Sequence, residues 1–403
     1  MSQKYPGGII SKTAPVTVGP VDGEGGSAPG VWTLTQALEL NKQGLWPKPV
    51  IPKELYAWGR NTYGQLGLND VAARSSPVQV GALTTWAQIA GGQYNSLAVK
   101  TDGTLWSWGL NSNGQLGLGD LNNRSSPVQI GALTGWSQIA GGSQQSLAIK
   151  TNGTLWSWGD GNSGRLGLGD TYSRSSPVQV GALTTWSQIA AGALHSLALK
   201  TDGTLWSWGQ NNYGELGQNN DISKSSPVQV GALTTWSQIA GGRQFSVAVK
   251  TDGTLWSWGR GNSGRTGLGD TYNRSSPVQI GALTTWYQVA AGNYFGIATK
   301  TDGTMWSWGG NGNGQLGIND VANRSSPVQV GALTTWSKIA AASYNCLAIK
   351  TDGTLWSWGV NNVGRLGLND IVNRSSPVQI GSLTTWLRLP KMTMSGSSLA
   401  IKS

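Results

Sequence analysis

The sequence predicts an all-β fold, a seven-bladed β-propeller whose blades are four-stranded antiparallel sheets. The first observation is a 50-residue unit that recurs seven times from about Glu54 to the C-terminus, with Trp-Ser-Trp-Gly or a close variant in constant register. Periods of about 40 to 50 residues that contain several strand-like segments are typical of propellers and related arrays. The second observation is that the repeat region starts and ends in the middle of a unit, which predicts a closed ring.

Each unit contains four short segments with strand character. In one copy these are residues 236–242, 246–250, 254–259 and 277–281. Thr-Asp-Gly-Thr between the second and third segments predicts a tight hairpin, because Asp-Gly readily adopts the positive φ that such turns need. A proline opens the fourth segment and has no N–H group to donate, so we expect that strand at the edge of the sheet.

The two ends of the repeat region complement each other. Residues 398–402 (SLAIK) form a second strand that no third strand follows, and residues 54–59 (ELYAWG) form a third strand that no second strand precedes. In the other copies these two segments follow one another across the hairpin. We therefore expect the N- and C-terminal strands to pair within one blade, which removes the open edge and closes the ring.

The unit LWSWGxNxxGQLGLGD…RSSPVQV…WSQIAGGxxxSLAxKTDG resembles the repeat of the regulator of chromosome condensation (RCC1) family. The resemblance covers roughly 350 of the 403 residues, and Gly-Gln-Leu-Gly and Asp-Gly are its most specific elements. It implies a propeller with a binding or regulatory role. The family includes guanine-nucleotide exchange factors, a plant ultraviolet-B photoreceptor and a bacterial inhibitor of β-lactamase, so the resemblance alone does not decide the function.

Two of these family activities are not expected in this chain. The photoreceptor relatives carry a Gly-Trp-Arg-His-Thr signature that the sequence lacks, and the Trp-Ser-Trp pairs are expected to pack between blades. The exchange-factor relatives need an inserted wedge in one blade, and no copy here has an insertion of more than two residues.

The formal net charge of +10 could indicate nucleic-acid binding, but its distribution argues against it. Within a typical unit, Arg74 and Lys100 are balanced by Asp70 and Asp102, and the recurring Asp and Arg predict an ion pair in each long loop. The excess is dispersed, with no dense basic run. It comes mainly from Arg60, Arg165, Arg243, Arg260, Arg265, Arg365, Lys4, Lys12, Lys42, Lys48 and Lys53.

The inventory of reactive residues predicts no enzyme, no metal and no cofactor. His195 is the only histidine and Cys346 the only cysteine, and we expect both to be packed structural residues. This excludes a zinc site and a Ser-His-Asp triad. One Asp per loop is too sparse for calcium, and the glycine-rich stretches lack the Lys-Ser/Thr of a phosphate loop. No run approaches 18 apolar residues, so no membrane span is expected.

Comparison of the copies separates constant from varied positions. The Thr-Asp-Gly-Thr hairpin and the Gly-Ala-Leu-Thr-Thr connection barely change, whereas residues 60–63, 71–73 and 93–95 and their equivalents vary. Loops of an up-and-down blade alternate between its two ends. All three varied stretches should therefore lie on one face of the ring, with the constant turns on the other.

The varied positions predict a recognition surface for a protein or glycan, because tyrosines among small polar residues suit adaptable contacts. The alternative is that these loops drift without constraint. The candidate binding residues are Tyr63, Tyr94, Asn95, Tyr172, Tyr213, Arg243, Phe245, Tyr272, Tyr294, Phe295 and Tyr344.

Residues 1–53 do not match the repeat and predict an extended arm followed by a short helix at about 33–43. Thr33 can cap this helix and Gly44 ends it. The segment, above all GVWTL…KQGLWP, resembles N-terminal segments of structural proteins of marine bacteriophages, which implies that it attaches the chain to a virion. The alternative is an ordinary extension. The candidate anchoring residues are Trp32, Leu34, Leu38 and Trp46.

The sequence thus predicts two regions, an anchoring segment (1–53) and a propeller (54–403). The first functional hypothesis is a non-enzymatic phage virion component, held through its arm to a virion structural protein, whose varied face binds a partner or a host surface. The second hypothesis is a cytoplasmic regulatory propeller that binds a cellular GTPase or enzyme, as an exchange factor or an inhibitor.

Overall fold

The fold is described from a computed structural model, in which residues 38, 51–390 and 396–403 are described. The chain divides into two compact units, Met1–Pro52 and Lys53–Ser403. The predicted helix at 33–43 and the anchoring residues Trp32, Leu34 and Trp46 lie outside the described residues. Leu38 is described, and its side chain is exposed.

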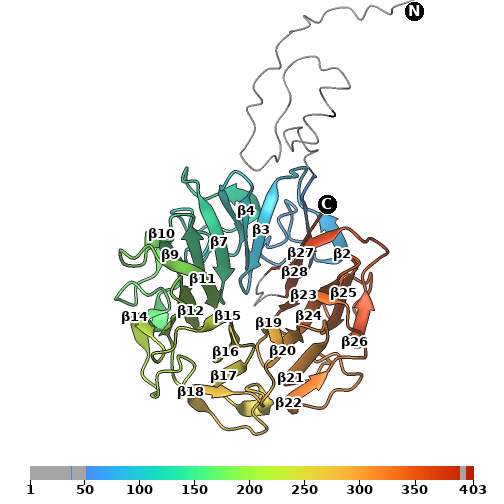
Figure 1. Cartoon of the computed structure of the whole chain (residues 1–403). Coiled ribbons are helices and arrows are strands. Elements are labelled where there is room, and N and C mark those ends of the chain that lie inside the picture. Colours follow the sequence, from blue (N-terminus) through green and yellow to red (C-terminus); the bar gives the residue numbers. More distant parts are fainter. Residues whose placement is uncertain (1–37, 39–50, 391–395) are drawn as a thin grey trace, which may run out of the picture. The chain divides into compact units, whose positions relative to one another are not determined.

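The second unit is a ring of seven four-stranded antiparallel sheets, which confirms the predicted fold class (Figure 1). The first strands of the blades are β3 (Trp86–Gly91), β7 (Trp136–Gly141), β11 (Trp186–Ala191), β15 (Trp236–Gly241), β19 (Trp286–Ala291), β23 (Trp336–Ala341) and β27 (Trp386–Arg388). The second strands are β4 (Asn95–Lys100), β8 (Gln145–Lys150), β12 (His195–Lys200), β16 (Phe245–Lys250), β20 (Phe295–Lys300), β24 (Asn345–Lys350) and β28 (Ser397–Lys402).

The third strands are β1 (Glu54–Gly59), β5 (Leu105–Gly109), β9 (Leu155–Gly159), β13 (Leu205–Gly209), β17 (Leu255–Gly259), β21 (Met305–Gly309) and β25 (Leu355–Gly359). The fourth strands are β2 (Arg74–Gln79), β6 (Arg124–Gln129), β10 (Arg174–Gln179), β14 (Lys224–Gln229), β18 (Arg274–Gln279), β22 (Arg324–Gln329) and β26 (Arg374–Gln379). Two 3₁₀ turns, η1 (Asn162–Gly164) and η2 (Asn262–Gly264), lie between third and fourth strands.

The hairpin between the second and third strands forms as the Asp-Gly pair predicts. Gly103 has φ of 77°, a conformation that costs glycine little. The carboxylate of Asp102 accepts hydrogen bonds from the Thr104 N–H (2.9 Å) and the Thr104 hydroxyl (2.7 Å). A local Asx-type cap therefore holds each turn, which explains why this stretch is constant.

The fourth strand lies at the edge of each sheet, as predicted, but its predicted bounds are wrong. In the copy used above it spans Arg274–Gln279 and not 277–281. Gly259 pairs with Arg274 and Ser257 with Val278, so the register shifts between these two pairs. Pro277 lies within this irregularity, where the ladder needs no N–H donor, so the strand can begin before the proline.

The N- and C-terminal strands pair as predicted. β1 lies beside β28 in a continuous antiparallel register from Glu54 opposite Lys402 to Gly59 opposite Ser397. The complete blade has the order β2-β1-β28-β27. One blade thus combines two strands from the start of the repeat region, β1 and β2, with two from its end, β27 and β28.

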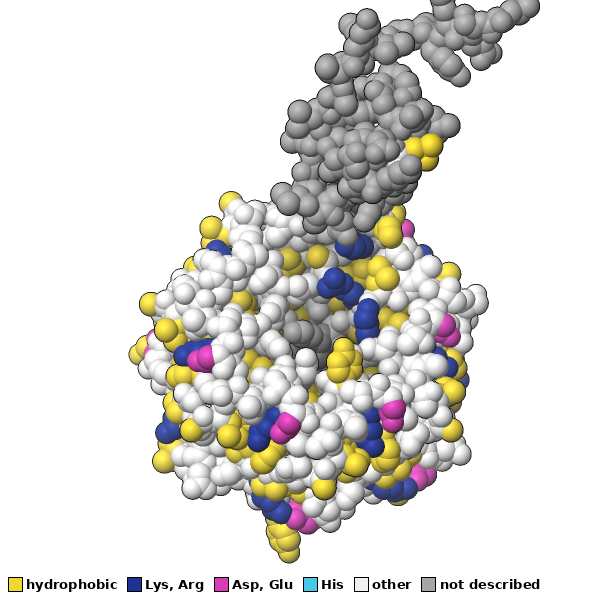
Figure 2. Space-filling model, viewed as in Figure 1, with side chains coloured by type: hydrophobic (Ala, Val, Ile, Leu, Met, Phe, Trp, Pro, Cys, Tyr) yellow, Lys and Arg dark blue, Asp and Glu magenta, His cyan; other side chains and the backbone are white. Residues whose placement is uncertain are grey.

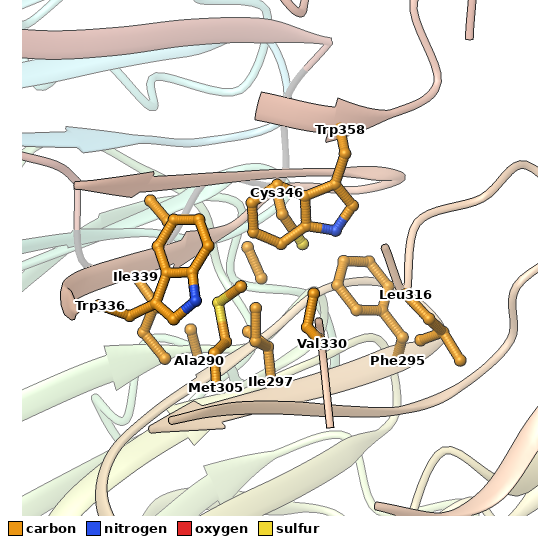
Figure 3. Packing of buried hydrophobic residues seen from close by; sticks show 12 residues of the cluster. Ala290, Phe295, Ile297, Met305, Leu316, Val330, Trp336, Ile339, Cys346 and Trp358 are labelled. Atoms are coloured by element: carbon orange, nitrogen blue, oxygen red, sulfur yellow. The ribbon is translucent and has the colours of Figure 1, made fainter. Parts of the chain in front are cut away.

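Hydrophobic cores lie between neighbouring blades. Figure 3 shows one of them, in which Phe295 and Met305 of one blade face Trp336 and Trp358 of the next. Cys346, which is fully buried, belongs to the same core. The second tryptophan of each Trp-Ser-Trp is therefore an inter-blade core residue, as predicted.

The first strands line a central channel of about 720 Å³. Gln188 on this wall donates its amide to the Ser237 carbonyl of the next blade at 2.8 Å. Lys338 and Arg388 stand at the same position in the last two blades, and Lys338 makes the equivalent bond to the Leu387 carbonyl. Basic side chains also gather beside the central opening in Figure 2. The position that Gln188 and Lys338 occupy on the first strands thus serves mainly to join neighbouring blades.

Truncating a buried side chain of the closing strand should destabilise the ring. Ile401 is fully buried and lies opposite Leu55. We expect Ile401→Ala to lower the free energy of unfolding by about 3 kcal/mol in urea titrations. The control is Lys402→Gln on the same strand, which removes an ion pair with Glu54 and should cost less than about 1 kcal/mol. Equal effects of the two changes would show that β28 does not close the ring in solution.

Candidate functional site on the variable face

The loops that vary between copies lie on one face of the ring, which we call the variable face. It consists of the loops between first and second strands and between third and fourth strands. Within one blade these two loops meet, because the Leu110 N–H donates to the Tyr94 carbonyl at 2.9 Å. On the opposite, constant face, the Thr101 N–H of the hairpin donates to the Thr85 carbonyl of the inter-blade connection at 2.9 Å.

Three of the candidate binding residues do not reach the surface, which corrects the prediction for them. Asn95, Phe245 and Phe295 are each 0% exposed. They are the first residues of second strands and not the last residues of loops. Their side chains turn inward, where Phe245 lies against Gly242 and Phe295 against Gly292. We therefore remove them from the candidate site.

The exposed candidates form separate groups. Tyr172 and Tyr272 project from the long loops and are 72% and 71% exposed. Tyr63 and Tyr94 form an edge-to-face pair with ring centroids 5.3 Å apart. Tyr294 lies against Tyr344, with ring centroids 5.7 Å apart. Tyr294 of this last pair is also in contact with two charged side chains, Arg243 and Arg265.

A buried ring position lies below this face and was not recognised in the sequence. The Trp108 indole donates to the Gln65 carbonyl of the preceding blade at 2.9 Å, and the Ser96 hydroxyl donates to the same carbonyl at 2.8 Å. The indole bond fixes the backbone at this position in each blade. The hydroxyl bond recurs in most blades, but the Arg265 carbonyl lacks it because Gly296 replaces the serine. The side chains at this ring position are Gln65, Gln115, Arg165, Glu215, Arg265, Gln315 and Arg365.

Arg265 of this ring joins five other side chains, which together we call the arginine–tyrosine cluster. Its members are Tyr213, Arg243, Arg260, Arg265, Tyr294 and Tyr344. The Arg265 guanidinium lies 4.7 Å from the centroid of the Tyr294 ring, and Arg243 donates to the Tyr294 hydroxyl at 2.7 Å. The Arg260 guanidinium lies 4.5 Å from the centroid of the Tyr213 ring. The cluster thus draws residues from loops of several neighbouring blades.

A cavity of about 420 Å³ opens beside the cluster. Arg260, Arg265, Tyr294 and Tyr344 are among its lining residues, together with Gly310 and Gly312 of the next blade. A side chain at Gly312 would meet no atom within 4 Å, so this part of the wall is open. The cavity is large enough for one side chain of a partner.

Comparison with protein families now identifies the fold family. The model of the regulator of chromosome condensation (RCC1) repeat matches residues 54–99, 102–149, 152–199, 202–249, 252–299, 302–349 and 352–389. The chain belongs to the RCC1-repeat family. No curated protein sequence matches it.

The RCC1-repeat propeller is also similar to solved structures. The yeast RCC1 protein Prp20 in its complex with Kap60 has a TM-score of 0.78 and 22% identity, over 87% of this chain and 89% of that one. Prp20p of Saccharomyces cerevisiae gives 0.77 and 23%, over 88% and 92%. Human WBSCR16 gives 0.79 and 20%, over 88% and 99%. At these identities the likeness shows the shared fold.

Burial changes the acid–base behaviour of two ring residues of the RCC1-repeat propeller. Desolvation, followed by the nearby Arg260 charge, lowers the pKa of Arg265 to about 10. Desolvation raises the pKa of Glu215 to about 7, against the opposing effect of hydrogen bonds and of Arg260. Glu215 is fully buried and accepts a hydrogen bond from the Tyr213 N–H at 2.8 Å. Both side chains therefore sit in a poorly hydrated environment.

The recurring Asp and Arg residues of the long loops, and His195, make structural contacts. Asp170 and Arg174 form the predicted loop ion pair at 2.6 Å, and the pair recurs in five other blades. His195 is fully buried and bonded to the Ser246 hydroxyl at 2.9 Å. Among the described residues, no three His, Cys, Asp or Glu side chains gather as metal ligands. No helix in the same part of the chain has the length and apolar character to cross a membrane.

The raised pKa of Glu215 predicts a pH-dependent stability. Between pH 4.5 and about 7 the folded protein keeps a proton that the unfolded chain releases, so stability falls as the pH rises through this window. Glutamine occupies this position in three other blades, as at Gln115. We expect Glu215→Gln to raise the free energy of unfolding by roughly 3 kcal/mol at pH 8 relative to its effect at pH 4.5.

Urea titrations of the wild type and the variant at both pH values measure this difference. The reciprocal change Gln115→Glu is the matched control and should introduce a similar loss of stability at pH 8. A Glu215→Gln effect that is the same at pH 4.5 and pH 8 would contradict the assignment.

Proposed function

We propose that this RCC1-repeat propeller is a non-enzymatic binding protein that holds a protein partner on its variable face, with the arginine–tyrosine cluster at the centre of the contact. The observation that carries the proposal is the cluster itself. Arginine and tyrosine are over-represented among the side chains that dominate binding energy at protein interfaces.

The cluster is organised before any partner arrives. The carbonyl of Arg265 accepts the Trp308 indole N–H at 3.0 Å, and its side chain donates to the Asn262 carbonyl at 2.9 Å. Tyr294 is held between Arg243 and Arg265. Side chains that are already ordered lose little entropy when a partner binds, which favours affinity.

The related structures support a protein partner. Prp20p was studied for its binding to Gsp1p and histones, and Prp20 was solved in complex with Kap60. The blades of this chain keep the 50-residue spacing except for two extra residues between β27 and β28, and the described loops contain no inserted element. We therefore propose partner binding or inhibition in preference to nucleotide exchange.

Attachment to a phage virion through residues 1–53 stays a prediction. The family match begins at residue 54, so it does not bear on this segment. Deleting residues 1–50 tests it, because the truncated protein should fold but fail to enter particles.

Paired capture experiments test the proposed face. The variant Tyr94→Ala/Tyr294→Ala/Tyr344→Ala removes three variable-face rings, and we expect it to bind the captured protein at least about tenfold more weakly. The matched control, Leu133→Ala/Leu283→Ala/Leu333→Ala, removes three exposed apolar side chains from the constant face. Affinities of both variants for the same purified partner are compared by calorimetry. Loss of binding in the leucine variant alone would contradict the proposal.

A further inference from the structure

We propose that the arginine–tyrosine cluster is a subsite for a carboxylate group, supplied by an acidic side chain of the partner. This inference rests on the proposed function and adds to it the chemistry that the site selects. It comes from a comparison between two blades of the same chain, one of which supplies its own carboxylate at the equivalent place.

In the blade of strands β7–β10, the ring arginine has an internal counter-ion. Arg165 and Asp160 form an ion pair at 3.1 Å, with side chains only 6% and 4% exposed. The Arg165 Nε also donates to the Asn162 carbonyl at 2.9 Å. The fold thus accommodates a buried guanidinium here when a carboxylate faces it.

In the blade of strands β15–β18, the same arginine has lost that carboxylate. Arg265 occupies the position of Arg165 and keeps the equivalent Nε bond, to the Asn262 carbonyl at 2.9 Å. The residue at the position of Asp160 is Arg260. A buried positive charge therefore has a second positive charge nearby, where the other blade has a negative one.

The surroundings of Arg265 add positive charge. Its Nη1 donates to the Arg243 carbonyl at 3.2 Å, so the Arg243 residue lies beside it. None of the three arginines forms an ion pair within the part of the chain that the structure describes. Burying charge without a counter-charge is costly, so a partner's anion would relieve a strain that the free protein carries.

Glu215, an acidic residue beside the cluster, does not neutralise it. Glu215 attracts Arg260, but no oxygen of its carboxyl group lies within ion-pair distance of that arginine. Its Oε2 is occupied by the Tyr213 N–H at 2.8 Å. The single carboxyl group of Glu215, whose pKa is raised, therefore does not balance the charge of the three guanidinium groups.

Donors and space are both available for the incoming group. The Arg260 Nε is buried and has no hydrogen-bond partner within the described residues, while its Nη1 donates to Gln244 Oε1 at 2.9 Å. Gln244 itself has φ of 70°, which is unusual for a residue other than glycine and often accompanies binding sites. The 420 Å³ cavity leads to Arg260 and Arg265 from the solvent side.

Arg365 is the third arginine at the ring position, after Arg165 and Arg265. It shows that the loss of the carboxylate at the position of Asp160 does not by itself make a binding site. Arg365 has Val360 at the position of Asp160, but its Nη2 donates to the Asn362 side-chain oxygen at 2.7 Å. An internal amide thus replaces part of the lost interaction. Within the described part of the chain, Arg265 donates only to main-chain carbonyls, and it lines the cavity that a ligand could enter.

A carboxylate fits this arrangement in geometry as well as charge. The planar guanidinium fork binds carboxylates through paired N–H donors, and such charge-assisted bonds are the stronger ones. The pair of Arg165 and Asp160 gives the geometry directly, in the same fold and at the same ring position. We therefore commit to an acidic protein segment and treat a phosphorylated one as an outcome of the test.

The test uses fluorescence anisotropy of labelled peptides with the full-length protein. The probes are hexaglutamate, hexaglutamine and a glycine-rich peptide with two phosphoserines. The key variant is Arg260→Asp, which places the protein's own carboxylate where Asp160 stands. Because this position accepts Asp160 and Gln210 in other blades, both Arg260→Asp and Arg260→Gln should fold, and circular dichroism checks this.

We expect hexaglutamate to bind the wild type and hexaglutamine not to bind. Arg260→Asp should weaken hexaglutamate at least about tenfold, and Arg260→Gln should weaken it less. The control Lys224→Asp makes the same change in net charge at the start of the edge strand β14 of another blade and should leave the affinity nearly unchanged.

Three results would overturn the inference. These are equal losses in Arg260→Asp and Lys224→Asp, equal binding of hexaglutamine, or binding of the phosphoserine probe alone. A captured partner that binds Arg260→Asp normally but loses affinity for the tyrosine variant would leave the proposed function standing and reject the carboxylate subsite.

Discussion

The structure depends above all on one inter-blade hydrogen bond, from a tryptophan indole to a backbone carbonyl of the preceding blade. All seven blades make it, at 2.9 or 3.0 Å, and the bond from Trp58 to the Arg365 carbonyl joins the closing blade to its neighbour. Each tryptophan is completely buried between two blades. Without the indole, most of these desolvated carbonyls would keep only the serine hydroxyl as a donor, and the Arg265 carbonyl, opposite Gly296, would lose the indole with no hydroxyl to replace it. A buried carbonyl that is left unsatisfied costs about 1–3 kcal/mol.

This bond explains why a scaffold that is constant between blades can carry different side chains. Gly67 and its equivalents must be glycine, since a Cβ at Gly67 would lie 2.8 Å from the Trp108 indole nitrogen. The residue that provides the carbonyl makes this particular bond through its backbone, so its side chain can differ between blades. Glutamine, glutamate and arginine all occur there. The same contact that builds the ring therefore holds the arginine–tyrosine cluster in place.

The ring itself could be predicted from the sequence, because blade number, strand order and closure follow from periodicity and from the cut hairpin at the two ends. The bounds of the fourth strand could not, since the irregular pairing around Pro277 depends on its partner strand. The burial of Phe245 was missed because a shift of one residue at a strand end turns a side chain from the surface to the core.

Only some members of the arginine–tyrosine cluster could be predicted from the sequence. Tyr294 and Tyr344 stood out because they vary, but Arg260 and Arg265 were counted as dispersed charge. Their proximity to Arg243 is set by the blade topology, which brings together loops distant in the sequence. The available signal was a comparison of Asp160 and Arg165 with Arg260 and Arg265, which shows the exchange of an internal acid for a base.

The central claim is that the constant face is structural and the variable face binds. Hydrogen–deuterium exchange of the protein, free and in complex with its captured partner, tests this most directly. The account predicts slower exchange in the complex for residues 242–245, 260–265, 292–295 and 310–315. Slower exchange confined to the Thr-Asp-Gly-Thr hairpins and the inter-blade connections, with these loops unchanged, would contradict it.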